Sequence, residues 1–409
     1  MKKIFNIVLF SFVAVLLSCG DDRSGEFYEV TKENQWIYSV MKERYLWSGS
    51  MPSLERNKFF TTPSSFFTSL LHKDDKVSFF DESESMGSYG MRFVLLRDPL
   101  GIQPGKVYAL VKDVDPGSPA YNAGVRRGTW ISAVAGMALS TTTNTIMSYG
   151  TGVEVVTEYI AYDEENGFYW AYGETLSIQA STNYSVNQVT LNSIYDLGER
   201  RVGYILLAGM DGDSFVDETM RIMNGFANNN VTDIVIDLRY CKGGTPSNAV
   251  ALASSVVPTE VYTAPFCSLK GTGGRVDKMY AYSAQEVNLG DKGLYIIIGN
   301  DTHGVAELFT SSVVSTRGAA VTVTVGSSTA GGGLVTEPVA SKFGFTINPV
   351  VARMYDSNEN TIPLSGVAPA FVIDEFADLL NINELGSEEE YILMNVFYLI
   401  ANGTLPDHE

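Results

Sequence analysis

The stretch DIVIDLRYCKGGTPSNAVALAS, residues 233–254, decides the fold of this chain. It opens with an apolar, β-branched run that predicts a buried strand ending at Arg239. On both sides of it, further strand patterns alternate with helix patterns, which predicts a mostly parallel, buried sheet over residues 202–375. The expected strands are 202–207, 294–298 and 320–325, and the expected helices are 214–228 and 306–316.

Residues 89–180 have a different character, with strand-forming runs that flank a Pro-Gly turn. The segment SPAYNAGVRRGTWISAVAG, residues 118–136, resembles the short helix, tight turn and following strand of PDZ domains. The resemblance implies a groove between a strand at 90–96 and a helix at 141–149, where an extended polypeptide or a protein C-terminus binds as an added strand. The residues expected to line this groove are Gly90, Met91, Phe93, Ile146 and Tyr149.

The first twenty residues have the pattern of an export signal. Lys2 and Lys3 precede an apolar run at 4–17 that is too short to span a bilayer comfortably. The run ends in LLSCG, residues 16–20, which resembles the lipobox of bacterial lipoproteins and implies a lipid on Cys19. We expect a protein of the bacterial cell envelope, periplasmic or on the outer surface, that meets the membrane through this lipid only.

Composition excludes several classes of function. The chain has 409 residues with 47 acidic and 28 basic side chains, a formal net charge of −19. Binding to nucleic acid needs clustered Lys and Arg, so we expect no nucleic-acid partner. Three Cys and three His predict neither a disulfide framework nor a multi-histidine metal site. The sequence AGGGL at 330–334 lacks the lysine and hydroxyl of a phosphate loop, and we expect neither a metal nor a cofactor.

The ends of the chain are predicted to be helical. Trp36, Ile37, Val40, Met41 and Tyr45 recur at helical spacing after a polar tether at 23–34. Near the C-terminus, SEEE at 387–390 predicts a capping box before an apolar helix that stops near Gly403. The predicted parts are a signal peptide (1–18), a tether and N-terminal helical region (19–85), a PDZ-like domain (86–182), an α/β core (190–380) and a C-terminal helix (381–409).

This order of parts resembles the carboxyl-terminal processing serine peptidases, also called tail-specific proteases. Asp237-Leu238-Arg239 and Gly243-Gly244 match the family's DLRxNxGG segment, with Cys241 at the usual Asn. SGVAPAFVID at 365–374 is similar to the terminal GxxPD strand, with Ala370 in place of Asp. The resemblance implies an oxyanion hole made by the backbone amides of Gly243 or Gly244 and Val305.

The same resemblance implies a serine nucleophile and a lysine general base, and neither side chain is present. The serine position falls on Gly304 and the lysine position on Gly332, while Ser327 stands where the family often has Glu. Cys241 and His303 form a possible alternative couple, since an imidazole can generate a thiolate. A second interpretation is that neither residue has a catalytic role. A third is that Cys241 forms a disulfide with Cys267.

These observations predict a lipid-anchored pseudopeptidase that binds polypeptide segments or protein C-termini through its PDZ-like domain and core cleft. One alternative is an active serine-type or Cys–His peptidase with relocated catalytic residues. Another is a purely structural envelope lipoprotein. Hydrolysis of peptides separates the active peptidase from the other two, and saturable peptide binding separates the pseudopeptidase from the structural protein.

Overall fold

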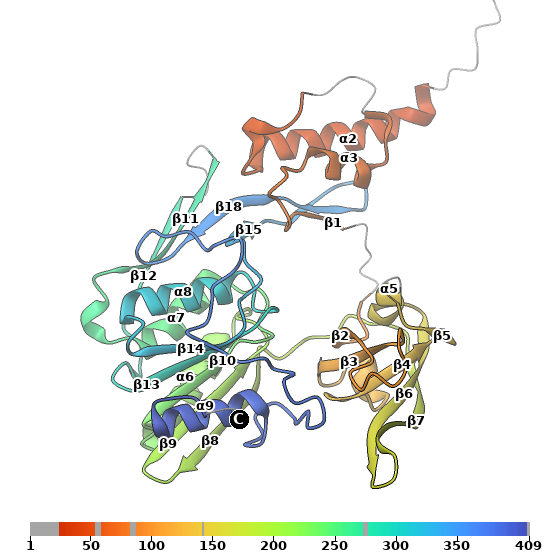
Figure 1. Ribbon diagram of the computed structural model, residues 1–409. Coiled ribbons are helices and arrows are strands. Elements are labelled where there is room, and N and C mark those ends of the chain that lie inside the picture. Colours follow the sequence, from red (N-terminus) through yellow and green to blue (C-terminus); the bar gives the residue numbers. More distant parts are fainter. Residues whose placement is uncertain (1–23, 54–58, 82–86, 141–142, 273–276, 407–409) are drawn as a thin grey trace, which may run out of the picture. The chain divides into compact units, whose positions relative to one another are not determined.

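The computed structural model of the chain describes residues 24–53, 59–81, 87–140, 143–272 and 277–406 (Figure 1). The signal peptide and Cys19 lie outside these residues. The chain divides into two compact units, one of residues 1–82 and 336–351 and the other of residues 83–335 and 352–409. The expected fold class, a mixed α/β protein with a small N-terminal helical region, is confirmed.

The first unit joins two helices to a small sheet. Helices α2 (Ser24–Arg44) and α3 (Pro63–Leu70) accompany three short strands in the order β1-β17-β16. These strands are β1 (Phe79–Asp81), β16 (Val339–Ala340) and β17 (Thr346–Asn348). The prediction of a tether at 23–34 is wrong, because α2 begins at Ser24 and its buried Ile37, Met41 and Asn34 anchor its later turns. Among the described helices, none is both long and apolar enough to cross a membrane.

The segment 336–351 belongs to this unit although it lies inside the range 190–380 assigned above to the core. Its strand β17 pairs antiparallel with β1, and the ring of Phe345 packs against Trp36 and Phe80. A pairing between strands so far apart in the chain leaves no local signal in the sequence, which explains the difference.

The second unit contains a β-rich domain over residues 87–182. Its sheet has the order β2-β3-β4-β6-β7, with β5 paired to β4. The strands are β2 (Met91–Arg97), β3 (Val107–Val114), β4 (Trp130–Val134), β5 (Met137–Ala138), β6 (Gly152–Asp163) and β7 (Gly167–Gln179), and the helices are α4 (Pro119–Asn122) and α5 (Asn144–Ser148). Ser118 caps α4 by accepting a hydrogen bond from the Tyr121 N–H, and the short helix and the following strand predicted in this segment are both present.

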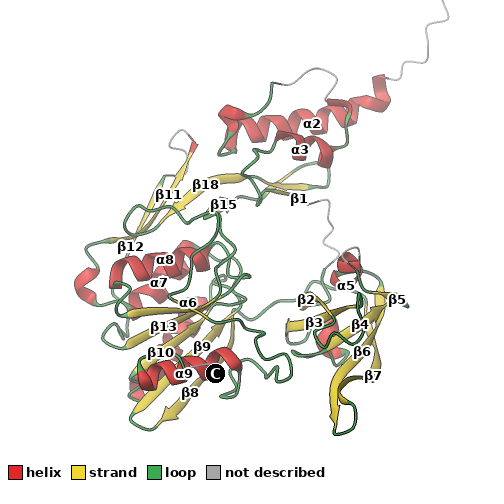
Figure 2. Ribbon diagram, in the orientation of Figure 1, coloured by secondary structure: helices red, strands yellow, loops and turns green. Residues whose placement is uncertain are grey.

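The rest of the second unit is an α/β core around a six-stranded sheet (Figure 2). The strand order is β19-β14-β13-β10-β9-β8, parallel except for the β8–β9 pair, which confirms the predicted parallel sheet. The strands are β8 (Val189–Leu197), β9 (Arg200–Leu207), β10 (Asp233–Asp237), β13 (Gly293–Ile298), β14 (Thr322–Gly326) and β19 (Phe371–Val372). A second sheet has the order β12-β11-β18-β15, with β11 (Pro265–Gly271), β12 (Lys278–Ala281), β15 (Leu334–Thr336) and β18 (Val350–Tyr355).

Helices cover both faces of the six-stranded sheet. Helix α9 (Tyr391–Asn402) packs with Val202, Tyr204, Val235 and Ile297 in one apolar cluster. Helices α6 (Phe215–Asn228), α7 (Pro246–Val256) and α8 (Val305–Arg317) lie on the other side, as Figure 1 shows. Burial on both faces explains why the central strands are almost wholly apolar.

The capping box predicted at Ser387 is wrong. The N-cap of α9 is Glu390, whose carboxylate accepts a hydrogen bond from the Leu393 N–H at 2.9 Å. The same carboxylate accepts hydrogen bonds from Arg239 at 2.7 and 3.1 Å. This tertiary ion pair holds Glu390 at the helix start, so the local pattern in the sequence does not decide the cap.

Arg239 is the centre of a buried charge network. Its fully buried guanidinium bonds Asp237 and Glu390 and approaches Glu375 at 3.4 Å. Arg127 of the β-rich domain binds the same carboxylates, Glu375 at 2.7 Å and Glu390 at 3.5 Å. The network therefore fastens the β-rich domain, the end of β10 and the start of α9 to one another.

We expect Arg239→Ala to lower the free energy of unfolding by about 3–5 kcal/mol, because it leaves buried carboxylates unpaired. The matched control is Arg201→Ala, which removes an exposed ion pair with Asp196 and is expected to lose no more than about 1 kcal/mol. Urea unfolding followed by tryptophan fluorescence measures both.

The effect of Arg239→Ala should shrink on acidification. Burial alone would raise the pKa of Glu390, but Arg239 and Arg127 hold it below its ordinary value. A lowered pKa stabilises the fold above the ordinary glutamate pKa of about 4.3, and this stabilisation is lost as the pH falls through the lower, folded-state value. Equal losses of stability at neutral and strongly acidic pH would contradict this assignment.

Candidate active site

The candidate site lies where three parallel strands end. Strands β10, β13 and β14 run side by side, and each is followed by a tight turn at its carboxyl end. Ligand sites of open α/β sheets occur at this edge, where loops from several strands meet. The turns that follow β10, β13 and β14 carry the residues matched to the oxyanion loop, the nucleophile and the lysine.

The first turn, residues 239–245, holds the two glycines expected in the oxyanion hole. Gly243 has φ +74°, and a Cβ placed there would meet no heavy atom within 4 Å. Gly244 has φ +123°, and a Cβ there would lie 2.6 Å from the Met210 carbonyl oxygen. Position 244 therefore requires glycine, because the backbone at Met210 approaches it closely. Gly243 faces open space.

The second turn links β13 to α8 and contains the nucleophile position. Thr302 fixes it, because its hydroxyl donates to the Leu238 carbonyl at 2.7 Å and accepts from the Gly299 N–H at 2.9 Å. Gly304 follows with φ 66° and ψ −116°, a conformation that residues with a side chain rarely adopt. A Cβ at Gly304 would meet no heavy atom within 4 Å. The position thus has a sharp strand-to-helix turn, in a backbone conformation that suits glycine, and an open space but no side chain.

The third turn carries the lysine position. Gly332 is buried, has φ +112°, and donates its N–H to the Pro363 carbonyl at 3.1 Å. In the same loop, Ala330 donates its N–H to the Thr302 carbonyl at 3.0 Å. The loop that carries the lysine position is therefore held directly against the turn that carries the nucleophile position.

Glu307 ties these two turns together. Its fully buried carboxylate accepts hydrogen bonds from the Gly304 N–H at 3.0 Å, the Gly331 N–H at 2.6 Å and the Thr329 hydroxyl at 2.5 Å. Within the described residues, the Glu307 carboxylate forms no ion pair with a lysine, an arginine or a histidine. Three donors at these distances nevertheless satisfy a buried charge well, since hydrogen bonds to ionised groups are the strong ones. This role of Glu307 was not predicted from the sequence, because Thr329 and Gly331 lie 22 and 24 residues further along the chain.

The expected oxyanion amides are close to this frame. Val305 is the first residue of α8, where backbone N–H groups have no acceptor inside the helix. Within the described part of the chain, neither the Val305 N–H nor the Gly243 N–H has a hydrogen-bond acceptor. Both amides are therefore available to a bound carbonyl oxygen.

Cys241 and His303 are joined by a hydrogen bond between their backbones. The His303 N–H donates to the Cys241 carbonyl at 3.1 Å, whereas the Cys241 side chain is fully buried. Burial and the nearby carboxylate of Asp237 raise the pKa of the Cys241 thiol far above its ordinary value. A thiol in these surroundings stays protonated, so the geometry does not favour a Cys–His couple.

The disulfide considered between Cys241 and Cys267 is not formed. Both are buried free thiols. Cys241 lies in the turn after β10 of the six-stranded sheet, and Cys267 lies in β11 of the four-stranded sheet. The two residues thus belong to different layers of the core.

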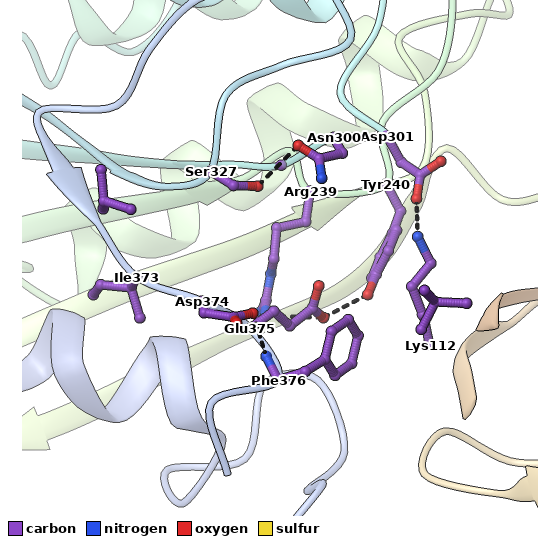
Figure 3. A pocket seen from close by; sticks show the side chains of 13 residues that line it. Lys112, Arg239, Tyr240, Asn300, Asp301, Ser327, Ile373, Asp374, Glu375 and Phe376 are labelled. Carbon is purple, nitrogen blue, oxygen red and sulfur yellow. Dashed lines mark hydrogen bonds and ion pairs between the residues drawn. The ribbon is translucent and has the colours of Figure 1, made fainter. Parts of the chain in front are cut away.

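A cavity of about 360 Å³ lies beside the strand ends (Figure 3). Asp301 binds Lys112 of the β-rich domain and Lys242 of the oxyanion loop, the latter at 3.0 Å. Burial alone would raise the pKa of Asp301, but the two ammonium groups hold it below its ordinary value. Opposite, the Tyr240 hydroxyl donates to Glu375 at 2.5 Å. The sequence offered no signal for this cavity, because its walls come from segments far apart in the chain.

The residues expected to line the peptide groove fall into two groups. Met91 is buried in the core of the β-rich domain, and both backbone groups of Gly90 are bonded internally, to Ser88 and Asp115. Phe93 and Ile146 are half-buried, and Tyr149 is exposed. Strand β2 is the terminal strand of its sheet, so one of its edges carries no neighbouring strand among the described residues.

The described residues contain no group of three or more His, Cys, Asp or Glu side chains placed to hold a metal ion.

Comparison with known families gives two matches. The model of Peptidase family S41 matches residues 201–373, and that of the Peptidase S41 N-terminal domain matches residues 32–79. Together they span more than half of the chain. No curated protein matches the chain.

Solved structures share the fold. A Bacteroides fragilis NCTC 9343 protein assigned to the S41 proteases is 24% identical, with a TM-score of 0.76 over 90% of this chain and 97% of that one. The photosystem II D1 C-terminal processing protease is 18% identical, with a TM-score of 0.53 over 84% of this chain and 93% of that one. Mature CPAF is 11% identical, with a TM-score of 0.55 over 93% of this chain and 99% of that one.

We expect Glu307→Ala to lower the free energy of unfolding by about 3 kcal/mol or more, because three buried donors lose a charged acceptor. Glu286→Ala is the matched control, since Glu286 is exposed. Urea unfolding compares the two variants, and an equal, small effect would show that Glu307 does not hold the turns.

We expect Cys241 and Cys267 to resist alkylation by iodoacetamide in the folded protein, because both thiols are buried and their pKa values are raised. Both should be alkylated in urea without a reductant. Peptide mapping by mass spectrometry makes the measurement. Rapid labelling of folded Cys241 would instead revive a reactive thiol at the site.

Proposed function

Because the chain belongs to peptidase family S41, we propose that it binds polypeptide segments at a peptidase-like site without hydrolysing them by a Ser–Lys mechanism. The observation that carries the proposal is Gly304, which keeps the turn and the open space of the nucleophile position without a nucleophilic atom.

The chemistry follows from the side chains. Nucleophilic peptide hydrolysis needs a hydroxyl or thiol to attack the carbonyl and a base to take its proton. Glycine at 304 and at 332 supplies neither group. The amides of Gly243 and Val305 can still bind a carbonyl oxygen, but in triad enzymes such amides with substrate binding retain only about 10³–10⁴-fold acceleration over water.

Two threonines and two lysines near the site are already engaged with other groups. The hydroxyls of Thr302 and Thr329 are engaged with the Leu238 carbonyl and with Glu307. Lys112 and Lys242 are both held in ion pairs with Asp301. A hydroxyl with its own acceptor and a lysine paired with a carboxylate are poorly placed to form a nucleophile–base couple.

Binding is supported by the β-rich domain. We propose that it acts as a PDZ-like module, in which an extended polypeptide pairs with the outer edge of β2 and reaches α5. Strand addition supplies backbone hydrogen bonds, while side-chain pockets give specificity. Phe93, Ile146 and Tyr149 remain at least partly accessible on these elements. Met91 and Gly90 contribute to the shape of the groove from inside the domain.

The envelope location is a separate part of the proposal. The apolar run and the sequence around Cys19 support export and lipid attachment. A lipid on Cys19 would hold the peptide-binding site near a membrane, and the acidic chain itself would not be attracted to an anionic surface.

We expect the wild-type protein to leave a broad peptide library intact and to remain unlabelled by fluorophosphonate probes. Gly304→Ser is the matched variant, since the site has space for the side chain, although the backbone there would be strained by about 1–3 kcal/mol. Mass spectrometry of the library and of the protein makes the measurement. Cleavage by the wild-type protein that a serine-directed reagent blocks would contradict the proposal.

We expect apolar peptide C-termini to bind the protein saturably, and Ile146→Asp to weaken that binding about tenfold or more by placing a charge beside β2. Met137→Asp is the control, because Met137 is an exposed residue of the same domain. Fluorescence anisotropy with labelled peptides measures both. Unchanged affinity in a folded Ile146→Asp variant would exclude this groove.

A further inference from the structure

The hairpin of β6 and β7 carries a surface that the proposed function does not use. In the sheet order β2-β3-β4-β6-β7, the hairpin lies at the edge opposite to β2. Figure 1 shows the two strands running on beyond β2 and β3 to a free tip. The hairpin is therefore a separate surface from the groove proposed above.

Large aromatic side chains are exposed along this hairpin. They are Tyr159, Tyr162, Phe168, Tyr169 and Tyr172, and their exposed fractions range from 38% to 66%. By contrast, Trp170 of the same hairpin is anchored, because it stacks on Tyr108 at 4.0 Å and donates to Asp98. The exposed rings are thus not part of this domain's core, and a cluster of exposed apolar groups of this kind marks an interaction surface.

The rings lie on both faces of the hairpin. Tyr159 is paired with Ala171, and Tyr169 with Ala161, so these two tyrosines share one face with small neighbours. On the other face Tyr162 lies directly opposite Phe168, with ring centroids 5.0 Å apart.

The charge of the hairpin has one sign only. Residues 152–179 contain six carboxylates and no lysine or arginine. One of them, Glu158, is paired with Lys106, the residue before β3. Within the described residues, the structure gives no ion pair to the exposed carboxylates of Glu154, Glu164, Glu165 and Glu174. The surface therefore presents aromatic rings among carboxylates that have no cation of their own.

A recess adjoins the exposed rings. The ladder shifts register near Glu158, and at Gly173 a Cβ would lie 2.5 Å from the Thr157 hydroxyl oxygen. A cavity of about 420 Å³ opens at this point, with Tyr159 and Glu174 in its lining and no lysine or arginine among the residues that form it. A ring and a carboxylate in one recess suit a cationic side chain, which the ring face attracts electrostatically and the carboxylate pairs with.

We propose that the β6–β7 hairpin is a docking surface for a polypeptide segment rich in lysine and arginine. Aromatic faces attract ammonium and guanidinium groups, and the unpaired carboxylates complement their charge. An anionic partner would meet like charges along the whole hairpin, and a neutral one would leave the carboxylates without a partner.

The test uses the purified full-length protein and a fluorescent synthetic peptide in which lysine alternates with glycine. We expect saturable binding by anisotropy, and no binding of the matched peptide in which glutamate replaces lysine. Affinity should fall when NaCl is raised from about 50 mM to about 300 mM, because salt screens exposed charges.

Variants locate the binding. Tyr159→Ser with Tyr169→Ser, and separately Glu164→Gln with Glu165→Gln, should each weaken lysine-peptide binding about tenfold. The matched control is Tyr398→Ser with Met394→Ser, which removes exposed apolar groups from α9 and should leave the affinity within about twofold. All variants change exposed side chains, and circular dichroism checks that they fold.

Three results would overturn the proposal. Equal binding of the lysine and glutamate peptides would show that the surface does not recognise positive charge. Unchanged affinity in both hairpin variants would show that the lysine peptide binds elsewhere on the protein. If the hairpin variants instead changed the sedimentation coefficient of the protein alone, the surface would serve self-association. None of these results affects the β2 groove, because the apolar peptides used for that site carry no lysine.

Discussion

The buried carboxylate of Glu307 holds the functional part of this molecule together. It receives the Gly304 amide from the turn after β13 and two donors from the loop after β14. A fully buried charge with fewer donors would destabilise the fold, so the two turns must stay where their donors reach it. The hydrogen bonds of Glu307 therefore hold the backbone of the nucleophile position close to that of the lysine position, and this does not depend on the side chains at the two positions.

In the proposed function, this chain keeps the backbone frame of a peptidase site without the nucleophile and the base. The proposed binding of a carbonyl group rests on the turn at Gly304, on the loop at Gly332, and on the amides of Gly243 and Val305, which have no acceptor in the part of the chain that the structure describes. Glycine at 304 avoids the backbone strain that a serine would suffer there. The network around Arg239 then joins this frame to the β-rich domain.

The sequence predicted the parallel core and the β-rich domain because their signals are local. Strand β10 is an apolar, β-branched run, and the SPAYNAGVRRG segment carries its own cap and turns. It did not predict that Glu307 accepts hydrogen bonds from Thr329 and Gly331, which lie 22 and 24 residues further along the chain. Nor did it predict the ion pair between Arg127 and Glu375, which are 248 residues apart. The aromatic hairpin was visible only as strand-forming sequence, since exposure depends on what packs against a face.

The most direct test of the account is the intact mass of the full-length protein after incubation with a reactive peptide ester. An ester acylates any serine, threonine or cysteine nucleophile at the site far more readily than an amide does, so it reports a hidden nucleophile with high sensitivity. The account predicts an unchanged mass for the wild-type protein. A mass increase equal to the peptidyl group, traced by fragmentation to a residue in the turns after β10, β13 or β14, would contradict it.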